Sequence, residues 1–175
     1  DPDTERVAHE RGAIWVTPHF GNFELVSLGT SFRGFDITIV AQDFKNPALT
    51  EVFRNLREGG GGKVISQQGA MIRLMKALKN RGHVALLTDL NIKPSKLAFA
   101  LDSFGMKSCA TLLHVDLARR LNVPVIACTC EPMGDGSYRG IMHQHLDPKD
   151  FKDSKEMAQA VWDIFESAIR KKPEA

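Results

Sequence analysis

A histidine and a glutamate lie five positions apart in the segment Thr17-Pro18-His19-Phe20-Gly21-Asn22-Phe23-Glu24. The carboxylate of Glu24 could hydrogen-bond one ring nitrogen of His19 and fix the orientation of the imidazole. The other ring nitrogen would then be a general base that removes a proton from a hydroxyl group. This pattern predicts His19 and Glu24 as catalytic residues.

The residues around His19 support this interpretation. Residues 13–17 are an apolar run that predicts a buried strand, and apolar residues at helical spacing predict a helix over 22–33. Pro18 and Gly21 separate the two. His19 therefore lies in a strand-to-helix turn, which is where open α/β sheets bind ligands.

The spacing alone is weak evidence, because the chain has six histidines and 21 acidic residues. A second pair with the same spacing, His145 and Asp150, has Pro148 between its members and no strand-to-helix turn. We interpret that pair as a loop coincidence. On local features alone, His19 is either a catalytic base or a structural histidine with satisfied hydrogen bonds.

Composition limits the class of protein. The 175 residues are 43% hydrophobic and 25% charged, as expected for one globular domain over 1–175. A net charge of +2 argues against nucleic acid as a partner. The three cysteines (Cys109, Cys128 and Cys130) lack the spacing of a metal site and indicate small buried hydrophobes. No apolar run is long enough to span a membrane, and no signal peptide is visible.

The hydrophobic pattern alternates between strands and helices. This alternation predicts an α/β fold with a largely parallel central sheet and helices on both faces. The expected strands are 13–17, 36–41, 63–66, 83–88, 123–130 and 138–143, and the expected helices are 22–33, 47–58, 69–81, 108–121 and 154–171.

Four glycines, Gly59–Gly62, precede Lys63 and superficially suggest a phosphate-binding loop. Arg57 occupies the position of the first glycine of that motif, and Val64 occupies the position of its Ser or Thr. The run is therefore interpreted as a flexible helix-to-strand connection.

Two arginines and an aspartate are candidates for substrate binding. Arg54 and Arg57 are three residues apart and leave one face of the expected helix, so their guanidinium groups could bind a phosphate. The alternative is an exposed basic face paired with Glu51 and Glu58. Asp89 ends an apolar strand, where site residues collect, although a turn or capping role is equally open.

The order of these segments resembles the bacterial lipid A biosynthesis acyltransferases, a branch of the lysophospholipid and glycerophosphate acyltransferase superfamily. The resemblance covers nearly the whole chain. It rests on His19-Phe20-Gly21-Asn22-Phe23-Glu24, on Lys45-Asn46-Pro47 with the Arg54 and Arg57 helix, on the strand ending at Asp89, on Ser103-Phe104-Gly105 with Ala110-Thr111, and on 117–126.

The resemblance implies a fold and a reaction. The fold is the α/β/α arrangement of the glycerophosphate acyltransferases. The reaction moves an acyl chain from a thioester, on acyl carrier protein or coenzyme A, to a hydroxyl of a phosphorylated lipid, foremost a lipid A precursor. It implies His19 and Glu24 as the catalytic pair, backbone N–H groups of Gly21 and Asn22 as oxyanion donors, and no metal or cofactor.

The resemblance also implies a location. Family members carry an N-terminal membrane anchor and a further C-terminal segment, so we expect residues 1–175 to be a core with little activity alone, working at the cytoplasmic face of the bacterial inner membrane. Phe20, Phe23 and 97–101 are the expected contacts with the acyl chain or the membrane. The segment 97–101 could equally be an edge strand.

This chain departs from the family pattern at two places. Ala41-Gln42-Asp43 replaces a Tyr-Arg-Pro, and Leu90 replaces a glutamine after Asp89. Both changes put the lipid A precursor in question as acceptor. Two other functions therefore stay open: an O-acyltransferase for glycerophosphate or another lipid hydroxyl, and a non-catalytic module that binds lipid or acyl carrier protein. A metallohydrolase is the weakest alternative, because no His-x3-His pair occurs.

Overall fold

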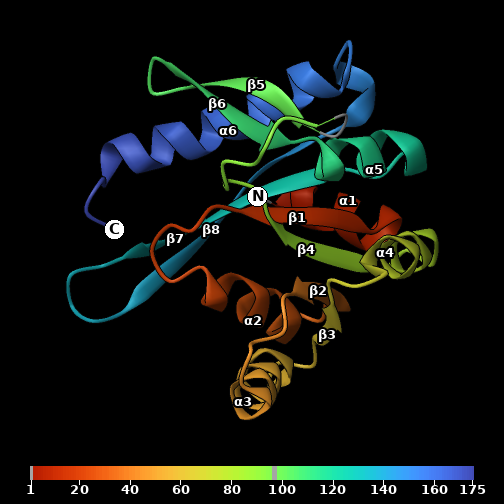
Figure 1. Ribbon diagram of the computed structural model, residues 1–175, viewed down its shortest axis with the longest axis vertical. Coiled ribbons are helices and arrows are strands. Elements are labelled where there is room, and N and C mark those ends of the chain that lie inside the picture. Colours follow the sequence, from red (N-terminus) through yellow and green to blue (C-terminus); the bar gives the residue numbers. More distant parts are fainter. Residues whose placement is uncertain (1, 96–97) are drawn as a thin grey trace.

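The computed structural model describes residues 2–95 and 98–175. Helices and strands alternate along most of the chain (Figure 1). The elements are α1 (Pro2–Arg11), β1 (Ala13–Thr17), α2 (Glu24–Phe32), β2 (Ile37–Ala41), α3 (Pro47–Glu58), β3 (Lys63–Ser66), α4 (Ala70–Lys79), β4 (His83–Leu87), β5 (Ala98–Ser103), β6 (Met106–Thr111), α5 (Leu113–Leu121), β7 (Val125–Pro132), β8 (Tyr138–Leu146), the 3-10 helix η1 (Pro148–Asp150) and α6 (Ser154–Lys171).

Six strands form one sheet in the order β3-β2-β4-β1-β7-β8. Neighbours from β3 to β7 are parallel, and β8 pairs with β7 in the antiparallel direction. The predicted α/β class with a largely parallel sheet is confirmed. All five residues of β1 are buried, as expected for a central strand covered on both faces. The carboxyl ends of β1, β2, β3 and β4 therefore meet at one edge of the sheet.

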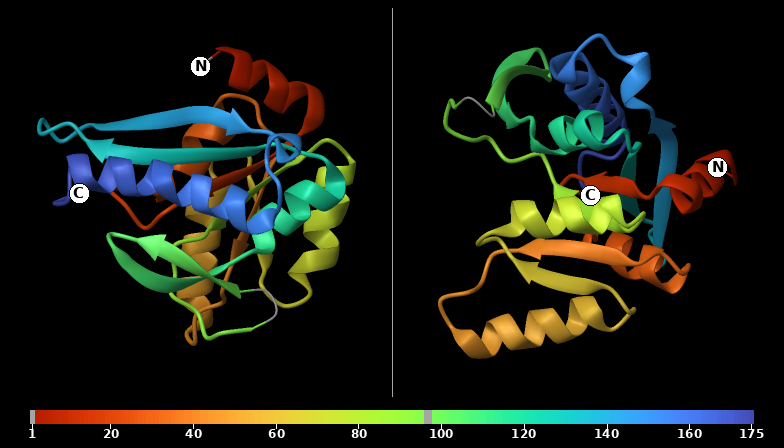
Figure 2. Two further views of the ribbon diagram at one scale, coloured as in Figure 1. Left: turned by 90° about the horizontal axis from the view of Figure 1, so that it is seen from above. Right: turned by 90° about the vertical axis from the view of Figure 1, so that its right-hand side faces the viewer.

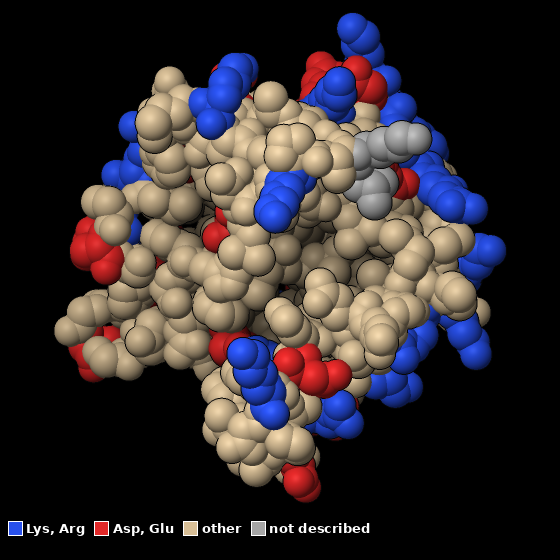
Figure 3. Space-filling view, viewed as in Figure 1, with Lys and Arg blue, Asp and Glu red and all other residues tan. Residues whose placement is uncertain are grey.

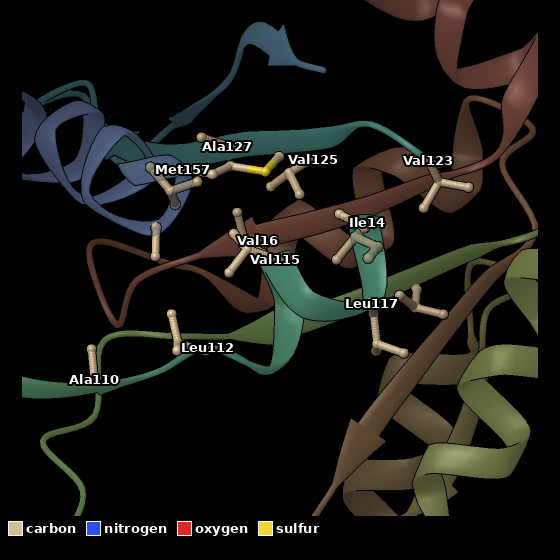
Figure 4. Packing of buried hydrophobic residues seen from close by; sticks show 14 of the residues in the cluster. Ile14, Val16, Ala110, Leu112, Val115, Leu117, Val123, Val125, Ala127 and Met157 are labelled. Carbon is tan, nitrogen blue, oxygen red and sulfur yellow. The ribbon is translucent and has the colours of Figure 1, made fainter. Parts of the chain in front are cut away.

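Helices cover both faces of this sheet (Figure 2). On one face, Ile14 and Val16 of β1 pack with buried side chains of α4, α5 and α6 (Figure 4). On the other face, Ala13 and Trp15 pack with residues of α1 and α2. Successive residues of a strand point to opposite faces, so β1 joins the two cores and is held firmly in place.

The helix α3 lies at one end of the molecule (Figures 1 and 2). It begins where Asn46 accepts a hydrogen bond from the N–H of Ala48 (3.0 Å) and Pro47 takes the first helical position. None of its residues is buried, and it packs against α2 and β3. α3 is therefore the most solvent-exposed of the helices that surround the site described below.

Residues 98–111 form a two-stranded hairpin, β5–β6, which lies against α6. The prediction of a helix over 108–121 is wrong at its start, because α5 begins only at Leu113. A tight turn closes the hairpin: Phe104 and Gly105 both have positive φ, as a type I′ turn requires. Phe99 and Leu101 are buried, so the edge-strand alternative describes 98–101 correctly, whereas Leu97 lies outside the described residues.

The helix α1 was not predicted either, because its apolar face is small. Only Thr4, Val7 and Ala8 are buried in it. The helix packs on β8, where the N–H of His145 donates to the Thr4 hydroxyl (3.1 Å). Among the helices that the structure describes, none has the length and apolar character needed to cross a membrane.

Candidate active site

His19 lies two residues beyond the end of β1, at the carboxyl edge of the sheet. Phe20, beside it, is buried and anchors the turn in the core. The backbone of Gly21 lies against that of Cys130 in β7, and a Cβ atom at position 21 would lie only 1.7 Å from the Cys130 carbonyl oxygen. Gly21 also has a φ of +59°, so glycine alone fits here. The turn is thus fixed to β7 and presents the His19 side chain, which is 40% exposed, to solvent.

Asp89 binds His19 through both of its carboxylate oxygens. One oxygen accepts the backbone N–H of His19 and the other contacts Nδ1, each at 2.8 Å. The register of the sheet explains the meeting: Thr17 pairs with Leu87, and His19 and Asp89 each lie two residues farther along. An ionised carboxylate only accepts hydrogen bonds, so Nδ1 carries the proton and Nε2 is left as the basic nitrogen.

Glu24 has a different partner. The guanidinium group of Arg57 donates to both of its carboxylate oxygens, from Nε (2.9 Å) and Nη2 (2.5 Å). The expectation that Glu24 hydrogen-bonds His19 is therefore wrong in this structure. Asp89 already binds Nδ1 of His19. Glu24 is the first residue of α2, within reach of the Arg57 guanidinium, whose two parallel N–H donors match the geometry of a carboxylate. The bond to Glu24 raises the pKa of Arg57 above its ordinary value, despite partial burial.

The two arginines of α3 therefore differ. The Arg57 side chain is 19% exposed, and its guanidinium pairs with Glu24 and lies over the Phe53 ring (5.6 Å). Arg54 is 46% exposed and is paired only loosely, with Nη2 at 3.9 Å from a carboxylate oxygen of Asp43. Over α3, positive and negative side chains lie next to one another (Figure 3). Of the pair, only Arg54 is open to an incoming anion.

The backbone N–H of Asn22 points to the thiol of Cys130. Burial raises the pKa of that thiol, and the Asn22 hydrogen bond partly offsets the rise. The two predicted oxyanion donors are therefore placed unequally: the Asn22 N–H faces the Cys130 thiol, whereas Gly21 holds the turn against β7. The Phe23 ring meets the His19 ring edge-on, with centroids 4.9 Å apart, and forms the apolar wall of the site.

A small cavity lies next to Asp89, behind Thr88, and was not anticipated from sequence. Its walls are aliphatic and aromatic side chains from the hairpin and α6, together with Thr111 and His114. The space open to the centre of a water molecule is about 10 Å³, enough for one. Neither ring nitrogen of His114 has a partner among the described residues, and burial lowers its pKa to about 4. His114 is thus a neutral imidazole inside the core.

The sequence predicted His19 and Asp89 at strand ends and the two arginines on one helical face, and it paired His19 with Glu24. The structure brings together His19 with Asp89, and Glu24 with Arg57. Across residues 2–95 and 98–175, no three His, Cys, Asp or Glu side chains gather as a metal ion would require.

Comparison with known proteins gives the wider context. A sequence model of the bacterial lipid A biosynthesis acyltransferases matches residues 4–175. No curated protein sequence matches the chain. Among solved structures, the 1-acyl-sn-glycerophosphate (LPA) acyltransferase PlsC from Thermotoga maritima is similar, with a TM-score of 0.59 and 16% identity over 98% of this chain and 70% of that one. At this identity the likeness shows a shared fold, a mostly parallel sheet with surrounding helices.

Proposed function

Because this chain belongs to the bacterial lipid A biosynthesis acyltransferase family, it is a lipid acyltransferase, and we propose that it moves a fatty acyl chain from a thioester to a hydroxyl of a phosphorylated lipid. The donor thioester is carried by acyl carrier protein or by coenzyme A. The contact between Asp89 and His19 is the observation that carries the proposal, because it leaves Nε2 as the basic nitrogen of a side chain that is 40% exposed and lies beside an apolar wall.

The proposed mechanism uses this pair as a general base. Nε2 of His19 takes the proton of the acceptor hydroxyl as its oxygen attacks the thioester carbonyl carbon. Asp89 stabilises the imidazolium that forms. The tetrahedral intermediate then expels the thiolate, which receives the proton from Nε2, so that an ester and a free thiol leave the enzyme. Holding the hydroxyl and the carbonyl together supplies a large share of the rate enhancement.

Glu24 takes a new role in this proposal. Its ion pair with Arg57 joins the start of α2 to α3. This link holds the helix that follows the His19 turn, and it keeps Arg54 near the site on the same helix. Arg54 is the proposed contact for the phosphate of the acceptor, since a guanidinium binds phosphate through two donors.

The lipid A precursor remains the first candidate acceptor, on the basis of the family. Asp43, in one of the altered positions, lies close to Arg54. An acidic residue there competes with an acceptor phosphate for the guanidinium. The fold neighbour is a 1-acyl-sn-glycerophosphate acyltransferase, so a lysophosphatidate is the second candidate acceptor.

The acceptor lipid must reach His19 from a membrane, and we propose the cytoplasmic face of the bacterial inner membrane. Three of the expected contacts are buried instead: Phe20 is 3% exposed, and Phe99 and Leu101 are covered by α6. Large exposed apolar side chains do occur at the carboxyl edge, where His19 lies. Among them are Phe44 after β2, Ile72 (77% exposed) in the first turn of α4, and Leu90 (61% exposed) after β4. We propose these three as the membrane contacts.

Turnover by the full-length protein with a panel of acceptors tests the proposed function. Acyl carrier protein and coenzyme A thioesters are each offered with a lipid A precursor, a lysophosphatidate, and their dephosphorylated forms. Transfer that is abolished by His19→Ala supports the proposal. Wild-type turnover in His19→Ala would overturn the mechanism, and lipid binding without any transfer would identify a binding module.

A further inference from the structure

Asp89 lies in a segment that has no regular secondary structure. After β4 ends at Leu87, residues 88–95 form neither helix nor strand. The contacts that the structure gives the Asp89 carboxylate are those to His19. Within the described residues, therefore, no further side chain holds this carboxylate in place, and its position depends on the path of the backbone around it.

Asn91 and Ile92 tie that backbone to the hairpin. Oδ1 of Asn91 accepts the backbone N–H of Cys109 in β6 (2.9 Å). The N–H of Ile92 donates to the carbonyl oxygen of the same Cys109 (2.8 Å). These two bonds meet on one residue and resemble a strand pairing, although residues 91 and 92 belong to no strand. They fix the chain two and three residues beyond Asp89.

The hairpin is itself held firmly, so it can serve as an anchor. Gln159 of α6 donates to the carbonyl oxygen of Asp102 (2.9 Å) and accepts its N–H (3.0 Å). At the hairpin turn, the N–H of Phe104 donates to Glu166 of the same helix (2.8 Å). Hydrogen bonds thus connect α6 to the hairpin and the hairpin to Asn91, which lies two residues from Asp89 in the chain.

We infer that Asn91 is a positioning residue: its side-chain oxygen, bound to Cys109, holds the loop in the path that lets Asp89 orient His19. Asn91 acts through Asp89 and does not touch the reacting atoms. The inference rests on the proposed function in one respect, namely that the orientation of His19 matters for turnover. The orientation itself can be measured without any substrate.

The test compares Asn91→Ala with Asn91→Asp. The contact needs only an acceptor, so aspartate keeps it and alanine removes it. We expect Asn91→Ala to lower kcat about threefold to tenfold with little change in the acceptor KM, since one of two hydrogen bonds is lost. Asn91→Asp should keep most of the wild-type kcat when both are measured on the plateau of the pH profile. Asn80→Ala, an exposed asparagine at the far end of α4, is the matched control and should change neither value.

Long-range ¹H–¹⁵N correlation spectra of the histidine rings give the second readout. In the wild type and in Asn91→Asp, His19 should carry its proton on Nδ1, and in Asn91→Ala a mixture of tautomers should appear. Unchanged kcat and an unchanged tautomer in Asn91→Ala would overturn the inference, as would equal losses in the alanine and aspartate variants. Turnover that survives His19→Ala would instead count against the proposed function, and the tautomer would still decide the role of Asn91.

Discussion

The carboxylate of Asp89 contacts His19 at two points, the backbone N–H and Nδ1, each 2.8 Å away. The two residues are 70 positions apart in the chain. They meet because β1 and β4 are neighbours in the sheet and Thr17 is in register with Leu87. The two contacts fix both the position and the tautomer of the imidazole.

Replacing Asp89 by asparagine should therefore be the most damaging change after the loss of His19 itself. The side-chain amide that this substitution introduces would be able to donate to Nδ1, which would place the imidazole proton on Nε2, where the base is needed. We expect Asp89→Asn to lower kcat by about 10²-fold or more, with a smaller effect on KM. Steady-state kinetics in the full-length protein measure this, and circular dichroism checks that the variant is folded. A kcat within about threefold of wild type would show that another group orients His19.

Glu24→Gln should act mainly on stability. It removes the charge that pairs with Arg57 across α2 and α3, in a contact that is only partly exposed. We expect a loss of about 1–2 kcal/mol in the free energy of unfolding, and a fall in kcat smaller than that of Asp89→Asn. Urea unfolding of Glu24→Gln, Arg57→Gln and the double variant gives the coupling between the two residues. A larger kcat loss in Glu24→Gln than in Asp89→Asn would restore Glu24 to the catalytic pair.

Arg54 should contribute to binding rather than to chemistry. A charge-assisted contact with a phosphate is worth about 1.5–3 kcal/mol, so Arg54→Ala should raise the acceptor KM about tenfold or more. Arg54→Lys should recover part of this, because lysine keeps the charge but not the forked geometry. The comparison with a dephosphorylated acceptor is decisive, and equal losses on both acceptors would mean that Arg54 supports structure alone.

Asp43→Asn is the companion change to Arg54. It removes the acidic neighbour of the guanidinium (3.9 Å), which competes with an incoming anion. We expect the KM for the phosphorylated acceptor to fall, with no change for the dephosphorylated one. An unchanged KM for both would show that Asp43 does not influence acceptor binding.

The buried histidines should make the fold sensitive to acid. Burial lowers the pKa of His83 and of His114 to about 4, against an ordinary value of 6.5. Both rings are neutral in the folded chain, whereas the unfolded chain binds protons as the pH falls below 6.5. The free energy of unfolding is therefore highest above pH 6.5. It falls between pH 6.5 and about 4, where the unfolded chain binds protons that the folded chain does not.

His114→Leu tests this directly. Leucine has a similar volume and leaves no ring nitrogen without a partner, so the variant should be more stable than wild type at pH 7, by about 1 kcal/mol or more. The loss of stability between about pH 7 and pH 4.5 should also be smaller. Urea unfolding at the two pH values measures both effects. A less stable variant at neutral pH would show that the His114 ring has a polar partner in solution.

How far the sequence could predict this site depends on the range of the interactions. The apolar run of β1 and the breaks at Pro18 and Gly21 are local, and they placed His19 correctly at the end of a strand. The partner of His19 is not local, because it depends on which strand lies beside β1. The His-x4-acid spacing favours a nearby carboxylate, whereas the sheet order supplies Asp89.

The same difference between local and long-range interactions applies to the prediction of the fold. Its alternating core elements have strong periodic patterns and were predicted. The β5–β6 hairpin was not, because its turn depends on Phe104 taking a positive φ that few non-glycine residues adopt. Once that turn is known, the burial of Phe99 and Leu101 against α6 follows. Their burial argues against the membrane contact expected for this segment, which is why we propose other residues for that contact.

The membrane contact can be tested on the exposed apolar residues of the carboxyl edge. Ile72 and Leu90 are 77% and 61% exposed, and each can bury most of its side chain in a bilayer. Since burying such a side chain contributes about 1.5–3 kcal/mol, Ile72→Glu and Leu90→Glu should each weaken vesicle binding about fivefold or more.

Phe32→Glu is the matched control: Phe32 is equally exposed but lies at the end of α2 that is remote from His19. Flotation with phosphatidylcholine vesicles, with and without phosphatidylglycerol, measures the binding. The net charge of +2 predicts only a modest gain from the anionic lipid. Equal binding by all three variants would remove the membrane contact from this edge of the sheet, and a selective loss in Phe32→Glu would move it to the opposite edge.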